Sequence, residues 1–461
     1  MPLLSINREP LYRSHMANTK RYWSGLDELR ETEAFKTIQG QEFPEAQSVD
    51  EFLTDERLES THTGRRDFLK FMGFGLTAAT LAACETPVIK SIPYTNKPEE
   101  VTPGVANHYA STYYDGHDFV NVLVKTREGR PIFVKSNTET GYGRVNARVN
   151  ASVLSLYDSA RLSGPQIGGE SSDWSTVDSA VSNVMQGEGR KVLLTNTVLS
   201  PSALRAIKQS GLEHIQYDAI DYGAFRASAQ ADFGVNSFPS YRLEEAEAIV
   251  TIGADFLGSF ADNVIYGERW AAMRKPESGK MSRVHAFETN MSLTGSNADY
   301  RTMVKPSEQG RVATALLAQI SGQGAAGQLS EEANKAVAAA ANDLKRAGSK
   351  GLVMAGSNDL ATQQVVNAIN AALGAVGSTV SYDSMTLFQG SSASLKQLTS
   401  DMKAGAVEVL IVADCNPVYD APNAAAFADA LAAMKHTVST SMFADETAAL
   451  CKVNAPTHHW L

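Results

Sequence analysis

The residues that offer the clearest chemistry in this sequence of 461 residues lie in the stretch RRDFLKFMGFGLTAATLAAC, residues 65–84. Arg65 and Arg66 are adjacent, and a mostly apolar run continues from there to Ala83. A helix needs about 20 apolar residues to span a bilayer, so this run has the length of a signal-peptide core rather than of a membrane span. Small residues precede Cys84, whose thiol could carry a lipid once the chain is cleaved in front of it.

Paired arginines, a short apolar run, small residues and a cysteine follow one another here in the order of a twin-arginine signal of the lipoprotein type. We therefore expect Arg65 and Arg66 to be the export signal and Cys84 to be the lipidation site. The alternative is a buried amphipathic helix that begins with two arginines. Export with a lipid anchor would place the protein on the periplasmic face of the cytoplasmic membrane.

Metal chemistry is restricted by the small number of cysteines, which are Cys84, Cys415 and Cys451. Four thiolates are needed to hold an iron–sulfur cluster, so this chain alone cannot build one from cysteine. No CxxC or HExxH pattern is present, and the adjacent histidines His458 and His459 lie at the end of the sequence, where such a pair is more often solvated than metal-bound. The sequence therefore predicts no metal site and no catalytic residue. We expect Cys415, in the segment ADCNP, to be a packed small side chain.

Composition narrows the class of protein further. The net charge is −10, which argues against a nucleic-acid partner, because such a partner requires a basic surface. Hydrophobic residues make up 43% of the chain and charged residues 20%, as in a packed globular protein. The length is sufficient for two or three domains.

The elements that must position any site follow a clear order along the chain. Residues 1–64 form a polar leader with one predicted short helix over residues 22–38, which either docks on a partner or belongs to a disordered segment. The export signal occupies residues 65–84. A linker and a β-rich segment follow over residues 85–165, with a predicted hairpin that turns at EGRP. Residues 166–461 are predicted to form an α/β domain.

The α/β prediction rests on short apolar strands that alternate with amphipathic helices from Trp174 onward. This alternation predicts a doubly wound parallel sheet with helices on both faces, here in two related subdomains. Such sheets bind ligands in the loops at the carboxyl ends of their strands. No GxGxxG follows the first strand and no GxxxxGK[ST] is present, so none of these loops carries a phosphate-binding fingerprint. The loops are TNTVLSPS, GADFLGSF, ETNMSLTGS, AGSNDLA and ADCNPVYDAP.

Taken in order, several segments resemble the molybdopterin oxidoreductases. The hairpin with Gly129-Arg130-Pro131 and the later segment with Leu156-Tyr157-Asp158, Arg161, Leu162 and Pro165 match the opening of that family. AIVTIGADF, ADYRTMVKPSEQG and ADCNPVYDAP are similar to the strand ends that hold its pterin–guanine dinucleotides. The resemblance covers residues 105–461 and implies a molybdopterin-oxidoreductase-like fold.

Departures from the family pattern decide what function the resemblance implies. Where the family has cluster cysteines, this chain has Tyr109, Ser111, Tyr113 and His117, which cannot replace thiolates. The usual cysteine ligand of molybdenum is also missing, although a serine or aspartate ligand stays possible. The resemblance therefore implies a scaffold that has lost its cofactors, with molybdopterin absent.

One subgroup fits both the departures and the long leader. YWSGLDEL, EFPEA and RRDFLKFMG resemble the corresponding segments of the large iron–sulfur subunit of alternative complex III, a bacterial quinol:electron-acceptor oxidoreductase. The resemblance implies a membrane-bound respiratory complex with haem c and integral membrane subunits as partners, in which this part is non-catalytic. It also implies that a cluster-binding half follows and that this sequence is a fragment. The alternatives are an active molybdopterin oxidoreductase with a non-cysteine ligand and an exported solute-binding lipoprotein.

Overall fold

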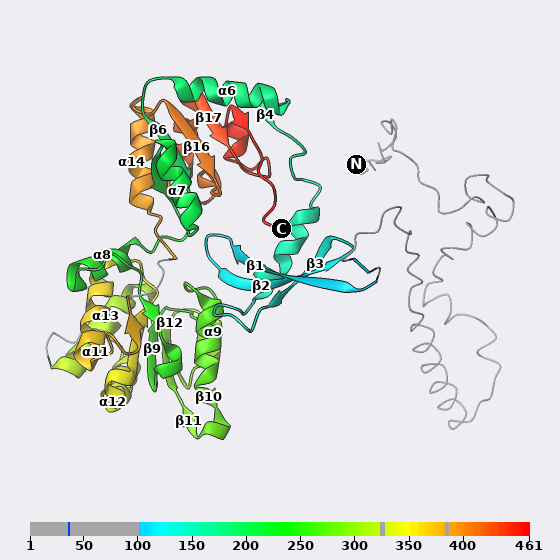
Figure 1. Ribbon diagram of the computed structural model, residues 1–461. Coiled ribbons are helices and arrows are strands. Elements are labelled where there is room, and N and C mark those ends of the chain that lie inside the picture. The colour runs from blue at the N-terminus through cyan, green and yellow to red at the C-terminus, as the bar shows by residue number, and fades with distance from the viewer. Residues whose placement is uncertain (1–35, 37–100, 103, 323–327, 383–386) are drawn as a thin grey trace, which may run out of the picture. The chain divides into compact units, whose positions relative to one another are not determined.

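The computed structural model describes residues 36, 101–102, 104–322, 328–382 and 387–461 (Figure 1). The chain divides into two units, Met1–Ile92 and Pro93–Leu461. Arg65, Arg66 and Cys84 lie outside the described residues, so their predicted roles stay predictions. Within the predicted leader helix, Lys36 is helical and exposed.

A three-stranded antiparallel sheet of order β1-β2-β3 opens the second unit. Val120, Val122 and Val124 alternate along β2 and are buried, as expected of a strand with one face in a core. Gly129 turns the chain between β2 and β3 with a φ of 76°, and the predicted hairpin is confirmed. The strand β1, on the other side of β2, was not predicted. The elements of this segment are β1 (Ala106–Tyr114), β2 (Phe119–Arg127), β3 (Arg130–Ser136), α5 (Ala147–Ala151) and the 3-10 helix η1 (Ser152–Tyr157).

The first lobe of the α/β part is built on a sheet of order β5-β4-β18-β17-β16-β6-β7, whose strands from β18 to β7 are parallel. Leu410 and Val412 of β16 face a core made with α14 and α16, and α6 covers the opposite face. The strands are β4 (Gln166–Ile167), β5 (Glu170–Ser171), β6 (Lys191–Thr195), β7 (Glu213–Gln216), β16 (Val409–Ala413), β17 (His436–Ser439) and β18 (Val453–Asn454). The helices are α6 (Trp174–Gln186), α7 (Pro201–Ser210), α14 (Ser392–Lys403), α15 (Pro417–Asp420) and α16 (Ala424–Ala433).

The second lobe contains a parallel sheet of order β13-β12-β9-β14. Every residue of β9 and of β14 is buried, because helices cover both faces of the sheet. The strands are β9 (Ala248–Ile252), β12 (Arg283–Glu288), β13 (Tyr300–Met303) and β14 (Gly351–Ala355). The helices are α8 (Gly223–Phe233), α9 (Asn263–Ala272), α10 (Leu293–Asn297), α11 (Gln309–Ser321), α12 (Glu331–Ala347) and α13 (Leu360–Leu373).

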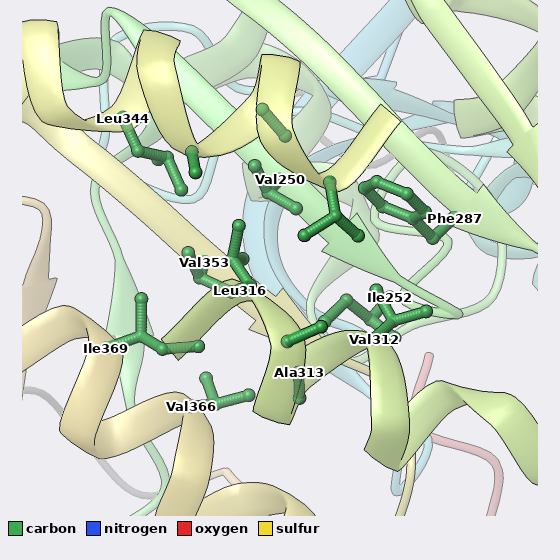
Figure 2. Packing of buried hydrophobic residues seen from close by; sticks show 14 of the residues in the cluster. Val250, Ile252, Phe287, Val312, Ala313, Leu316, Leu344, Val353, Val366 and Ile369 are labelled. Atoms are coloured by element: carbon green, nitrogen blue, oxygen red, sulfur yellow. The ribbon is translucent and has the colours of Figure 1, made fainter. Parts of the chain in front are cut away.

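Packing within the second lobe explains why these apolar runs became strands and helices. Figure 2 shows Val250 and Ile252 of β9 and Val353 of β14 against Leu316 of α11 and Ile369 of α13. The opposite face of the sheet packs on an aromatic cluster from α8, α9 and the loops between them. The doubly wound fold predicted from the sequence is therefore confirmed.

Helix ends in both lobes carry the expected local signals. Ser200 caps α7 by accepting a hydrogen bond from the Ala203 N–H, and Pro201 is the first helical residue. Gly211 ends α7 with a φ of 72°, a left-handed conformation that glycine adopts without strain. Gly322 and Gly374 end α11 and α13 of the second lobe in the same left-handed conformation.

The chain passes through the first lobe twice, before and after the second lobe. It forms β6 and β7, passes into the second lobe for β9 to β14, and returns to add β16, β17 and β18 beside β6 (Figure 1). Two short antiparallel pairs, β8 (Ser240–Tyr241) with β15 (Val380–Ser381) and β10 (Arg274–Lys275) with β11 (Lys280–Met281), complete the second lobe. Among the helices in the described ranges, none has the length and apolar character needed to cross a bilayer.

Candidate functional site

The topology marks two places where an α/β sheet of this kind would bind a ligand. In the first lobe β7 and β16 lie on opposite sides of β6, and in the second lobe β12 and β14 lie on opposite sides of β9. The strand order reverses at these points, so the loops beyond the carboxyl ends of the neighbouring strands diverge and leave a crevice. We call these two places the first and second switch points. The loops that the sequence predicts at the carboxyl ends of the strands lie there.

At the first switch point one carboxylate binds the surrounding backbone. Asp218, which is 3% exposed, accepts hydrogen bonds from the Thr197 N–H at 2.8 Å and the Thr197 hydroxyl at 2.6 Å. It also accepts one from the Gly390 N–H at 2.8 Å, while the Thr197 hydroxyl oxygen accepts one from the Gln389 N–H at 2.6 Å. These N–H groups are the donors that an anionic ligand would otherwise use.

The same contacts fasten the two connections between the lobes. The outgoing connection carries Asp221, whose carboxylate accepts hydrogen bonds from the Gly223 N–H and from the N–H of Ser392, the first residue of α14. Arg226 of α8 donates to the Gly390 carbonyl at 3.1 Å. A Cβ on Gly390 would lie 2.2 Å from the Asp218 nitrogen, so glycine is required for this close approach.

At the second switch point the backbone after β9 and the backbone after β14 lie in direct contact and fill the space between the two strand ends. A Cβ on Gly356, after β14, would lie 2.2 Å from the Gly253 carbonyl oxygen, after β9. The N-terminus of α13 already holds an anion, because the Asp359 carboxylate accepts hydrogen bonds from the Thr362 N–H at 2.9 Å and its hydroxyl at 2.7 Å. These bonds lower the pKa of Asp359, so it carries its charge at neutral pH.

A second buried carboxylate closes the neighbouring strand end in the same lobe. Glu288, the last residue of β12, is 7% exposed and accepts a hydrogen bond from Arg301 at 2.6 Å. It also accepts bonds from the Ser292 hydroxyl at 2.5 Å and the Ser292 N–H at 3.2 Å. A Cβ on Gly295 would lie 1.9 Å from Glu288 Oε1, so the first turn of α10 packs directly on this carboxylate.

The β-rich segment and the second lobe meet at a pair of buried acids. Asp118 is fully buried, and although burial raises its pKa, hydrogen bonds from His117, Asn146 and Arg148 hold that pKa below its usual value. For Asp262 the charges of Arg269 and His117 and the Ile265 N–H lower the pKa only in part, and its Oδ1 makes no hydrogen bond within the described ranges. Burial, and then the charge of Asp118, raises the pKa of Asp262 from 3.8 to about 7.

The backbone around Asp262 is held in an uncommon conformation. Ala261 has a φ of 47°, a left-handed value that residues with a side chain seldom adopt, and its N–H donates to the Tyr222 hydroxyl at 2.8 Å. Asp262 lines a small cavity of about 20 Å³ together with Tyr142 and Arg269, which is room for about one water molecule. This arrangement holds a proton near neutral pH, and nothing in the sequence pattern pointed to it.

The residues that stand where the resemblance predicts cluster cysteines have different environments in the β-rich segment. Tyr113 is buried and donates to Asp115 at 3.1 Å, whereas Tyr109 is exposed. His117 Nδ1 lies 3.4 Å from Asp118 Oδ1. Within the described ranges, no three His, Cys, Asp or Glu side chains are grouped so that they could hold a metal ion.

The two cysteines in the described ranges are packing residues. Cys415 lies at the end of β16, where its thiol reaches the Leu194 carbonyl at 3.9 Å and burial raises its pKa well above the usual value. Burial likewise raises the pKa of Cys451 to about 12. A thiol with a raised pKa is a poor nucleophile, so neither cysteine is activated for nucleophilic chemistry.

The donor set at the switch points does not fit the dinucleotide that the family resemblance implies. A diphosphate needs free backbone N–H groups, a helix N-terminus or cations. Here Asp218 binds two backbone donors at the first switch point, the N–H groups of Thr197 and Gly390, and Asp359 occupies the helix N-terminus at the second. A bound diphosphate would have to displace these carboxylates, and their negative charge would repel it.

No protein-family profile matches the sequence, and no curated protein does. Among solved structures, acetylene hydratase from Pelobacter acetylenicus is similar, with a TM-score of 0.53 and 12% sequence identity over 77% of this chain. The chain covers 61% of the length of that protein. At this identity the likeness shows the fold alone, which is molybdopterin-oxidoreductase-like.

A formyltransferase/hydrolase complex from Methylorubrum extorquens, solved in complex with methylofuran, gives a TM-score of 0.43. Its sequence identity is 14%, and the match covers 64% of this chain and 86% of that one. This second likeness is too weak to indicate a shared fold.

Proposed function

We propose that this chain is a non-catalytic scaffold in an exported, membrane-associated respiratory complex, a quinol:electron-acceptor oxidoreductase of the alternative complex III type. In this role it binds no molybdopterin and holds an iron–sulfur electron-transfer half against haem c and integral membrane subunits. The observation that carries the proposal is the Asp218 carboxylate, which takes the N–H groups of Thr197 and Gly390 at the edge where open α/β sheets bind their ligands.

The sequence supports the same role. Arg65, Arg66 and Cys84 have the order of an export and lipidation signal, and no cysteine lies between Cys84 and Cys415. A molybdopterin enzyme of this fold would need a route for electrons away from its metal, and this chain offers no thiolates for it. A scaffold needs no such route.

The surface offers a face on which a partner subunit could pack. Tyr300 and Met303 lie on β13, the edge strand of the second lobe, and are 51% and 73% exposed. Met291 and Leu293, just before and at the start of α10, are also exposed. Exposed apolar groups along a sheet edge are typical of protein–protein contacts. This face is our candidate for contact with another subunit of the complex.

The proposal is tested by purifying the native protein from membranes in mild detergent and identifying what accompanies it. A multihaem cytochrome c and integral membrane subunits in fixed ratio with this chain are the expected result. A protein that leaves the membrane alone would contradict the scaffold role and favour a solute-binding lipoprotein.

The same purification tests the proposed contact face. Met303→Glu places a charge on the edge strand and should weaken co-purification, because a buried unpaired charge destabilises an interface. Met281→Glu is the matched control, since Met281 is also exposed but lies on β11. Equal recovery of partners with both variants would show that the contact lies elsewhere on the surface. It would not contradict membership in the complex.

A further inference from the structure

An apolar cavity of about 150 Å³ lies between α6 and the face of the first-lobe sheet that α6 covers. Val181, Val184 and Met185 line it from the helix, and Val409 and Ile411 line it from β16. The cavity reaches the first residues of β16 and β17, at the amino ends of the strands. It is therefore separate from the switch points, which lie at the carboxyl ends.

The cavity exists because the side chains of α6 do not fill the space between the helix and the sheet. Of the thirteen residues of this helix, Val177 alone is buried, while Val181, Val184 and Met185 are only partly covered. Ala180 also lines the cavity and its side chain is too short to fill it. Apolar cavities of about this volume in proteins stay dry and accept small apolar groups.

Cations surround the apolar walls. Lys435, His436 and Lys452 also line the cavity, and both lysines are exposed. Neither lysine makes an ion pair within the described ranges, whereas His436 has Glu408 at 3.8 Å. The two ammonium groups lie beside the apolar walls of the cavity. Their charge is complementary to an anion whose apolar part would enter the cavity.

We propose that this cavity binds a fatty acid, with its alkyl chain between α6 and β16 and its carboxylate against Lys435 and Lys452. An apolar cavity of this volume holds a molecule about the size of benzene, so it suits one short alkyl chain. Burial of methylene groups supplies the affinity, and the lysines select the head group. The inference is independent of the proposed scaffold role.

The first test is a titration of the purified full-length protein with octanoate, monitored by isothermal titration calorimetry. Ala180→Leu should lower the affinity about tenfold or more, because the added side chain fills the space of the ligand. Ser182→Leu adds the same group at an exposed position of α6 that does not line the cavity, and it should bind as the wild type does. Matching thermal unfolding of the two variants would show that Ala180→Leu remains folded.

The second test separates the head group from the chain. Replacing both Lys435 and Lys452 by Gln should weaken octanoate binding about tenfold and leave octanol binding unchanged. Lys403→Gln, at an exposed position of α14, is the control. The proposal would be overturned if octanoate failed to bind the wild type below about 1 mM, or if Ala180→Leu bound it as tightly as the wild type. Equal loss of octanoate and octanol binding in the double variant would overturn the role of the lysines.

Discussion

Asp218 and Gly390 lie 172 positions apart in the sequence, yet the Gly390 N–H donates to Asp218 Oδ2 at 2.8 Å. Asp218 belongs to the segment that leaves the first lobe and Gly390 to the segment that returns to it. A single carboxylate thus joins both connections and the loop after β6, at the point where the fold would otherwise leave a ligand crevice.

Removal of the Asp218 carboxylate should destabilise the protein. In Asp218→Ala the buried donors of Thr197 and Gly390 lose their acceptor, at a cost of about 2–4 kcal/mol in the free energy of unfolding. Urea unfolding measures this difference. Asp178→Ala is the control, because Asp178 is exposed on α6. Equal unfolding midpoints for both variants would show that Asp218 does not hold the connections together.

The Asp262 carboxyl group should make stability depend on pH. Its pKa is raised to about 7 in the folded protein, against 3.8 ordinarily, so between these values the folded state binds more protons than the unfolded state. The free energy of unfolding should therefore fall, by a few kcal/mol at most, as the pH rises from about 4 to 7.

Asp262→Asn is the variant that isolates this contribution. The neutral amide should flatten the decline with pH and make the variant more stable than the wild type at about pH 8. Unfolding midpoints across the pH range give the comparison, with Asp178→Asn as an exposed control. An unchanged pH profile in Asp262→Asn would mean that Asp262 is ionised in the folded protein at neutral pH.

Two glycine substitutions should act in opposite directions. A Cβ at Gly295 would lie 1.9 Å from Glu288 Oε1, so Gly295→Ala must displace the carboxylate from Arg301 and Ser292. We expect a loss of about 1–3 kcal/mol in the free energy of unfolding. At Gly267, inside α9, a Cβ would only touch Leu257 at 3.9 Å, and Gly267→Ala should stabilise by about 0.5–1 kcal/mol. Thermal unfolding measures both variants. A higher melting temperature for Gly295→Ala as well as for Gly267→Ala would refute the packing at Glu288.

The export signal can be tested without any change to the folded unit. Replacing Arg65 and Arg66 by Lys keeps the charge but removes the arginine pair that the transport machinery reads, so the protein should stay in the cytoplasm. Cell fractionation with immunodetection measures this. A conservative change at another basic position of the leader, Arg57→Lys, should leave export unchanged. Normal export of the double-lysine variant would show that another signal is used.

Much of the fold could be predicted because its strands are continuous apolar runs. β9, β14 and β16 are short stretches of buried residues bounded by polar turns, and the helices between them have helical spacing. The strand β1 was not predicted, since Tyr, Ser, Thr and Ala alternate there without a clear apolar face. α14 was not predicted either, because polar residues outnumber apolar ones along its sequence.

The filled switch points could not be predicted for a different reason. The position of their loops follows from strand order, which local periodicity indicates. The pairing of Asp218 with Gly390 depends instead on how the chain returns to the first lobe, and no local pattern encodes it. The raised pKa of Asp262 likewise arises from burial beside Asp118, which comes from a different part of the chain.

The most direct test of the central claim is the molybdenum and tungsten content of the protein purified from its native membranes, measured by mass spectrometry together with pterin analysis. Asp218 and Asp359 occupy the donors that a dinucleotide would need, so neither metal nor pterin should accompany the chain in stoichiometric amount. About one molybdenum or tungsten atom per chain, with pterin, would contradict the claim and make this chain an active oxidoreductase subunit.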